Sequence, residues 1–199
     1  MDFLDHYPIV SDQINRTELR VILRELQKVL TAGVDGDVVE LGCYVGTTSL
    51  FLQRMLAGTP KTLHVYDSFA GLPPKAVQDV SPAGEQFKQG ELAAGKAQLI
   101  KHFKQAGLPL PVIHKAWFED LTVADTPDHI SFAFLDGDFY TSILASLKVV
   151  WPKLTPGAVV IIDDYHTEAL PGVRQALKEW SRDHSFTVHI EASLGVITR

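Results

Sequence analysis

The chain has 199 residues, of which 46% are hydrophobic and 21% are charged, as in an ordinary folded domain. Its net charge of −6 argues against a nucleic-acid-binding protein, which needs a basic face. It has neither an apolar run near the roughly 20 residues that cross a bilayer nor a secretory signal pattern at its start. A single cysteine, Cys43, excludes an internal disulfide. Taken together, length, charge and cysteine content lead us to expect one cytoplasmic domain (1–199) without membrane or nucleic-acid partners.

The first 36 residues are predicted to form an arm followed by an amphipathic helix. Between Asn15 and Thr31, apolar residues recur at helical spacing: Leu19, Ile22, Leu23, Leu26, Val29 and Leu30. Residues 2–11 before the helix are expected either to fold over another part of the molecule or to form a frayed end.

A glycine-containing turn follows the first predicted strand, Asp37–Leu41, and leads into a helix that ends near Leu56. Gly42 and Gly46 let a strand turn tightly into a helix and let the backbone approach a ligand. Their G-x-x-x-G spacing is not the dinucleotide pattern G-x-G-x-x-G, and the chain lacks a G-x-x-x-x-G-K-[ST] phosphate loop. The preceding acid, Glu40, suits a cationic ligand better than a pyrophosphate. The missing G-x-G-x-x-G pattern, together with the acids that follow the later strands, disfavours a nicotinamide oxidoreductase.

An acid ends the second predicted strand, 62–66. At this position Asp67 would hold a ribose diol, although it could instead cap the following turn. The glycine turn and Asp67 together predict an adenosine-type ligand that need not carry phosphates. Residues 68–90 are rich in proline and glycine without periodicity, so they form either a lid beside the ligand or a surface excursion.

The next elements are a helix over residues 91–106 and a strand over residues 110–114. An aromatic pair, Trp117 and Phe118, follows that strand. These rings either flank an adenine or belong to the core.

The centre of the chain carries two apolar strands that each end in carboxylates. Residues 130–135 are followed by Asp136 and Asp138, and residues 158–162 by Asp163 and Asp164. A helix over residues 141–154, closed by Pro156–Gly157, makes the two strands parallel neighbours, so the acids meet at the ligand-binding edge of the sheet. Because crowded acids repel one another unless a cation or shared protons hold them, we predict a cation here, and oxygen ligands favour Mg²⁺ or another hard ion.

Individual acids of this group have open alternatives. Asp163 and Asp164 would point to opposite faces of a regular strand, so both can bind a cation only if the strand has already ended. Asp164 could instead cap the next helix, and Asp138 could be a ligand or cap the helix that begins near Tyr140. His166 is a candidate general base, with a solvated loop histidine as the alternative.

The chain closes with a helix over residues 171–183 and two strands, 186–191 and 194–198, that form a hairpin. Seven strands with alternating helices predict an α/β, three-layer Rossmann-like sandwich, in which a seven-stranded, mostly parallel sheet ends in a C-terminal antiparallel hairpin.

Four motifs, in order, carry a resemblance to a known family: ELGCYVGTTSL, VYDSFAGLP, FLDGDFY and VVIIDDYH. They resemble the motifs of class I S-adenosylmethionine-dependent methyltransferases, and most closely those of the macrocin O-methyltransferase family. The resemblance covers roughly residues 37–180 and implies the class I methyltransferase fold. It also implies a small-molecule hydroxyl acceptor and, from the family's tendency, a homodimer.

The resemblance assigns roles to particular residues. It implies that one group of residues contacts S-adenosylmethionine: Glu40, Gly42, Tyr44, Gly46, Thr47, Asp67, Ser68, Trp117, Phe118 and Asp136. Asp136, Asp163 and Asp164 match the magnesium ligands, and Asp136 also matches the base that takes the hydroxyl proton.

These observations predict a metal-dependent O-methyltransferase that acts on a hydroxyl of a small molecule, such as a natural-product sugar. The alternatives are a methyltransferase for a catechol-like or other acceptor, and a protein that binds S-adenosylmethionine without catalysis.

Overall fold

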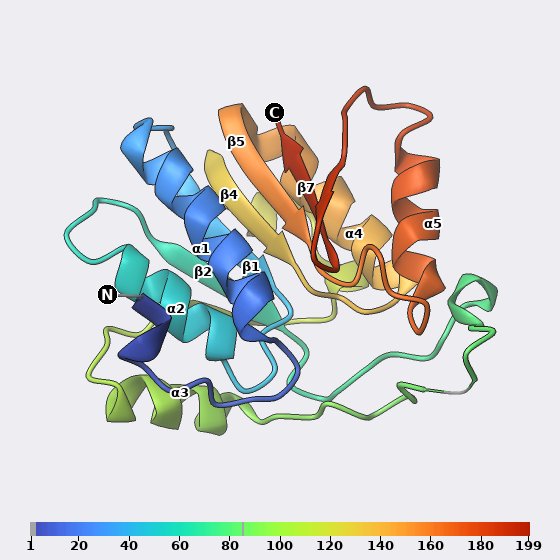
Figure 1. The fold of residues 1–199 in the computed structure, drawn as a ribbon, viewed down its shortest axis with the longest axis horizontal. Coiled ribbons are helices and arrows are strands. Elements are labelled where there is room, and N and C mark those ends of the chain that lie inside the picture. The colour runs from blue at the N-terminus through green and yellow to red at the C-terminus, as the bar shows by residue number, and fades with distance from the viewer. Residues whose placement is uncertain (1–2, 85) are drawn as a thin grey trace.

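The computed structural model describes residues 3–84 and 86–199 and is built around one seven-stranded sheet (Figure 1). The sheet has the order β3-β2-β1-β4-β5-β7-β6. Its strands are β1 (Asp37–Leu41), β2 (Leu63–Asp67), β3 (Val112–Lys115), β4 (Ile130–Leu135), β5 (Leu154–Ile162), β6 (His189–Glu191) and β7 (Leu194–Thr198). Only the pairs that involve β7 are antiparallel among the described strands, which confirms the predicted parallel sheet with a C-terminal hairpin.

Helices cover both faces of the sheet and complete the three layers. They are α1 (Arg16–Thr31), α2 (Thr47–Met55), α3 (Lys96–Gln105), α4 (Tyr140–Val150) and α5 (Pro171–Trp180). One apolar core joins the sheet to α1, α2 and α3, and the other joins it to α4 and α5. Alternate residues of a strand enter opposite cores: Phe132 and Phe134 of β4 face the first, and Ala133 and Leu135 face the second.

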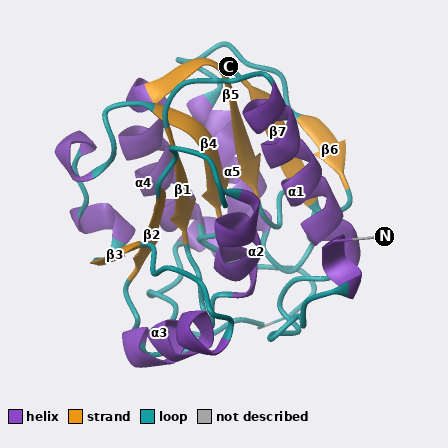
Figure 2. Cartoon of the chain, turned by 90° about the vertical axis from the view of Figure 1, so that its left-hand side faces the viewer, coloured by secondary structure: helices purple, strands orange, loops and turns teal. Residues whose placement is uncertain are grey.

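The carboxyl ends of the four central strands lie level at one edge of the sheet. Leu41 is paired with both Tyr66 and Leu135, and Leu135 is also paired with Ile162. The residues that follow these four positions therefore emerge side by side. This edge faces the loop-rich lower part of the molecule in Figures 1 and 2.

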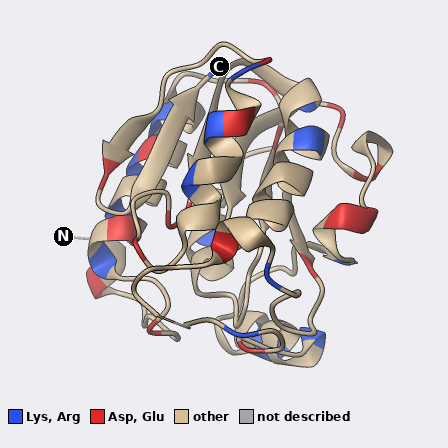
Figure 3. Ribbon diagram, turned by 90° about the vertical axis from the view of Figure 1, so that its right-hand side faces the viewer, with Lys and Arg blue, Asp and Glu red and all other residues tan. Residues whose placement is uncertain are grey.

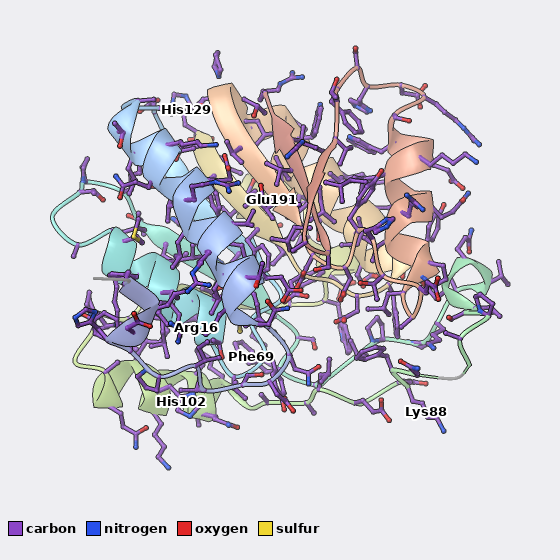
Figure 4. All side chains as sticks on the ribbon, viewed as in Figure 1. Arg16, Phe69, Lys88, His102, His129 and Glu191 are labelled. Atoms are coloured by element: carbon purple, nitrogen blue, oxygen red, sulfur yellow. The ribbon has the colours of Figure 1, made fainter. Side chains whose placement is uncertain are left out.

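The N-terminal arm folds over the helices rather than fraying. Leu4 and Ile14 are buried, and the Phe3 ring packs edge-on against Phe51 of α2 at 6.0 Å between centroids. Arg16, which is labelled beside this arm in Figure 4, donates to the Leu4 carbonyl. Asp2, the first residue of the predicted arm, lies outside the described residues.

The hairpin is held to α1 by charges. Glu191 of β6 lies against α1 (Figure 4), where its carboxylate accepts from Arg24 Nη1 at 2.7 Å. Acidic and basic residues are interspersed along the helices on the side that Figure 3 presents. In the described part of the chain, no helix is long and apolar enough to cross a membrane.

Several predicted boundaries are wrong for local reasons. The helix expected from residue 91 begins at Lys96, because Leu92 has a left-handed backbone with φ of 56°. The helix expected to reach residue 154 ends at Val150, before Pro152, whose ring cannot continue it. β5 consequently begins at Leu154 and is longer than predicted. At the other ends, α5 stops at Trp180 rather than at residue 183, and β6 is confined to His189–Glu191.

Candidate active site

A cleft of about 860 Å³, measured with its open mouth, lies along the carboxyl edge of the sheet. Nine predicted residues line the cleft: Gly42, Tyr44, Asp67, Ser68, Trp117, Phe118, Asp136, Asp163 and Asp164. The structure therefore brings these nine residues together at one cleft.

Gly42 permits the close approach of β1 and β4 at the floor of the cleft. Its φ is 95°, and a Cβ built on it would lie 1.8 Å from the Asp136 carbonyl oxygen. The backbone N–H of Asp136 donates to the Leu41 carbonyl at 2.8 Å. A larger residue at position 42 would therefore push apart the two strand ends that carry the glycine turn and the acids.

Asp67 fixes the glycine turn in place. Its Oδ2 accepts from the backbone N–H groups of Cys43 at 2.9 Å and Tyr44 at 3.3 Å. Its Oδ1 accepts from Phe69 N at 2.7 Å, so Asp67 also caps the following turn. On the other side of the glycine turn, His102 of α3 (Figure 4) contacts the Val45 carbonyl at 2.8 Å.

Three predicted cofactor residues lie behind the cleft wall: Glu40, Gly46 and Thr47. Glu40 is fully buried; its Oε2 accepts from Ser49 Oγ, whereas its Oε1 has no hydrogen-bond partner among the described residues. Burial raises the pKa of Glu40 to about 8. Thr47 Oγ1 is likewise buried without a partner in the described chain. Gly46 precedes α2 with φ of 89° and contacts Leu99.

Four aspartates meet on the opposite half of the cleft. Carboxylate oxygens of Asp136, Asp138 and Asp164 all lie within 4.8 Å of one another. These three side chains are partly open to the cleft but surrounded by protein, whereas Asp163 is buried beside them. The predicted ligands were Asp136, Asp163 and Asp164. In the structure Asp163 lies next to the triad, and Asp138 is its third member.

Burial and mutual repulsion raise the pKa values of these acids. Burial, followed by the charge of Asp163, raises the pKa of Asp136 well above its ordinary range. Burial, followed by the charge of Asp164, raises the pKa of Asp138 to about 7. The same causes raise the pKa of Asp163. The main causes of these shifts are burial and other acids, so the acids would gain from a cation or from shared protons.

The two acid-bearing turns each contain an aspartate with left-handed backbone. β5 ends at Ile162, and Asp164 has a left-handed φ of 52°, so the strand has ended as the prediction required. The Asp164 side chain accepts from Thr167 Oγ1 at 2.9 Å and does not cap α5. Asp138, with φ of 57°, does not cap α4, whose N-cap is Phe139.

Left-handed backbone is concentrated around the cleft. Seven described residues other than glycine have positive φ, and five of them line it: Tyr44, Phe87, Leu92, Asp138 and Asp164. Such conformations are held by surrounding structure and cluster at functional sites. This concentration supports a ligand-binding role for the cleft.

Aromatic and apolar side chains form the remaining wall of the cleft, beside the glycine turn and the aspartates. Trp117 is 37% exposed, whereas Phe118 is 9% exposed and belongs to the core. Of the predicted lid, Gly71, Leu72, Pro73 and Phe87 line the cleft, and backbone bonds join Leu72 to Gly90 and Glu91. The 68–90 segment therefore borders the site; Glu85 within it is outside the described residues.

His166 is not brought into the cleft. Its side chain is exposed, it is absent from the described lining, and its Nδ1 lies 3.4 Å from Arg174 Nη2. Gln13, Glu119 and Ser142 line the cleft although we did not predict them. The sequence offered little signal for these three, since each stands in a segment without a motif.

The sheet order, with its reversed β7, and the cleft at the switch point between β1 and β4 define the class I methyltransferase fold. The solved O-methyltransferase NovP has this fold: its TM-score is 0.79 at 24% identity, covering 94% of this chain and 81% of that chain. The calicheamicin methyltransferase CalS11 has a TM-score of 0.72 at 18% identity, with coverages of 92% and 80%.

Within this class, the chain belongs to the macrocin O-methyltransferase (TylF) family, which matches residues 5–195. A tetracenomycin-C rhamnosyl 4'-O-methyltransferase of Streptomyces olivaceus is 32% identical over 72% of this chain and 58% of its own length. Mycinamicin III 3''-O-methyltransferase of Micromonospora griseorubida is 28% identical, with coverages of 94% and 76%. The chain thus spans little more than half the length of the first of these relatives.

Proposed function

We propose that this chain is an O-methyltransferase that moves a methyl group from S-adenosylmethionine to a hydroxyl of a small molecule, such as a natural-product sugar. One observation carries the proposal: a single cleft has two halves. One half is built around Asp67 and Trp117, and the other contains the clustered aspartates. Family membership supports it, as do relatives named for O-methylation of tetracenomycin and mycinamicin glycosides.

The donor half suits S-adenosylmethionine. A solved Bacillus cereus O-methyltransferase of the same fold is described in complex with S-adenosylhomocysteine. We place the ribose hydroxyls at Asp67 and the adenine against Trp117 and Phe118, next to the backbone of Ser68. Glu40 does not belong to the described lining of the cleft, so it would support the glycine turn behind the methionine end rather than contact the cofactor. Gly42 and Tyr44 would then border the methionine chain.

The acidic half fits a hard divalent cation. Three carboxylates whose oxygens lie within 4.8 Å of one another are the kind of donor set that Mg²⁺ takes. Asp136, Asp138 and Asp164 would hold the ion, and Asp163 would add charge beside it. When bound, the ion would lower the pKa of an acceptor hydroxyl.

The chain's own residues account for the transfer step. The acceptor oxygen attacks the methyl carbon, the carbon–sulfur bond breaks in line, and S-adenosylhomocysteine leaves. The hydroxyl proton passes to a carboxylate; Asp138 and Asp136 are the candidates, because both open into the cleft. The lid residues Leu72 and Phe87 would exclude water.

Methyl transfer from radiolabelled S-adenosylmethionine tests the proposal. The acceptors would be rhamnosylated polyketides with free vicinal hydroxyls and, separately, simple catechols, each with Mg²⁺ or with EDTA. We expect transfer to the glycosides, loss with EDTA, and loss in Asp164→Asn but not in the exposed control Asp183→Asn. Transfer to catechols alone would favour the alternative acceptor class. Cofactor binding without transfer to any acceptor would favour a binding protein and overturn the proposal.

A further inference from the structure

A buried aspartate in the lid contacts the helix that follows the acid-bearing turn of β4. Asp79 ends a short 3-10 turn, Val77–Asp79, and is fully buried. Its Oδ2 accepts from Ala76 N at 2.9 Å, and its Oδ1 accepts from Tyr140 N at 2.8 Å. Figure 1 shows this turn beside the lower end of α5, away from the base of the lid.

Tyr140 is the first residue of α4, and its N-cap, Phe139, supplies no side-chain hydrogen bond. Asp79 therefore caps α4 from 61 residues earlier in the chain. A carboxylate in this place satisfies an N–H group left free by the helix and lies at the positive end of its dipole. Phe139, fully buried, follows Asp138 directly, so fixing Tyr140 fixes the Asp136–Asp138 turn.

The same carboxylate touches the start of α5. A Cβ built on Gly172 would lie 1.8 Å from Asp79 Oδ1, so any larger residue there would displace Asp79. Two residues beyond Asp79, Ser81 Oγ donates to the Glu168 carbonyl at 2.7 Å, in the segment between Asp164 and α5. The outer part of the lid therefore bonds to both segments that follow the acid pairs.

We propose that Asp79 is a positioning residue whose contacts with α4 and α5 hold the Asp136–Asp138 and Asp163–Asp164 turns at their working separation. The inference rests on the proposed function for its effect on turnover, but the contact itself does not. The acids lie on separate strands, and 4.8 Å among their oxygens is kept only if both turns are fixed. The lid would thus build the acidic half of the site in addition to covering it.

Two variants break this contact in independent ways. Asp79→Asn keeps the size of the side chain but replaces one acceptor oxygen with a donor. Gly172→Ala leaves Asp79 in the chain but occupies its space. The matched control is Asp125→Asn: Asp125 caps the turn Val123–Asp125 through the same local bonds to Thr122 and does not line the cleft.

Hydrogen exchange of the full-length protein tests the contact without reference to activity. We expect faster exchange in residues 136–143 for Asp79→Asn and Gly172→Ala, and no change there for Asp125→Asn. With S-adenosylmethionine and an acceptor, kcat should fall about tenfold to a hundredfold in both variants. The affinity for S-adenosylhomocysteine should stay within about threefold, because Asp67 and the glycine turn lie on other elements.

Each result decides a separate point. Unchanged exchange in both variants would overturn the contact. Faster exchange with wild-type kcat would overturn the positioning role. If wild type transfers no methyl group, the proposed function fails, and Mn²⁺ affinity replaces kcat as the measure: it should weaken in both variants, and an unchanged value would overturn the positioning role.

Discussion

Substitution of Gly42 should separate the strain of the glycine turn from its role in binding. Gly42→Ala imposes a left-handed backbone on alanine, at about 1–2 kcal/mol. It also places a methyl group 1.8 Å from the Asp136 carbonyl, which belongs to backbone and cannot rotate away. With overpacking at about 1–3 kcal/mol, the total loss of unfolding free energy is about 2–5 kcal/mol.

Two other glycines provide matched controls. Gly33 has φ of 63° and open space around it, so Gly33→Ala measures strain alone. Gly36 has φ of 109°, and its added Cβ would meet His129 backbone at 2.7 Å, at the opposite edge of the sheet. Gly36→Ala therefore reproduces strain with a backbone clash, but away from the cleft.

Denaturant titration and calorimetry of S-adenosylhomocysteine binding would be run on all three variants. We expect Gly33→Ala to lose least stability and Gly36→Ala and Gly42→Ala to lose more. Under conditions where all are folded, only Gly42→Ala should weaken binding, by about tenfold or more. Equal stability losses at Gly33 and Gly42, with unchanged binding at both, would refute the reasoning.

Three further predictions concern the acids and the cleft wall. Because burial and Asp164 raise the folded-state pKa of Asp138 to about 7, the folded state binds more protons than the unfolded state below that pH. Without metal, wild type should therefore lose stability relative to Asp138→Asn as pH rises from about 4 to 7, on the order of 1–3 kcal/mol by denaturant titration; a difference that stays constant with pH would contradict this. Trp117→Ala should weaken S-adenosylhomocysteine binding about tenfold by calorimetry while changing stability by less than about 1 kcal/mol, since the ring is 37% exposed; unchanged affinity would remove Trp117 from the site. His166→Ala should keep kcat within about twofold across the pH profile, because its side chain is outside the described cleft lining; loss of the acid limb, where a base is protonated and inactive, would restore it as a base.

The sequence predicted the parts of the site that depend on local pattern. Apolar runs that end in Asp67, Asp136 and Asp163 identified the strand ends, and parallel strands bring such ends to one edge. The glycine turn was found because Gly42 must adopt positive φ.

The parts that depend on distant contacts could not be predicted. Asp138 enters the triad through a left-handed backbone with φ of 57°, which the sequence pattern did not indicate at this position. Asp79 caps a helix 61 residues away, and a proline-rich segment gives no indication of such a partner. His166 was judged by its neighbours Asp163 and Asp164, but the chain turns at Asp164 and carries it outward.

Calorimetric titration of Mg²⁺ into the S-adenosylhomocysteine complex is the most direct test of the acidic half as a cation site. The titration would compare wild type with Asp164→Asn, which removes one charge of the triad, and Asp183→Asn, which removes an exposed charge elsewhere. We predict one binding event in wild type and Asp183→Asn that is lost in Asp164→Asn. Absence of binding in wild type, with and without a vicinal diol acceptor, would contradict the account and leave the aspartates to act by proton transfer alone.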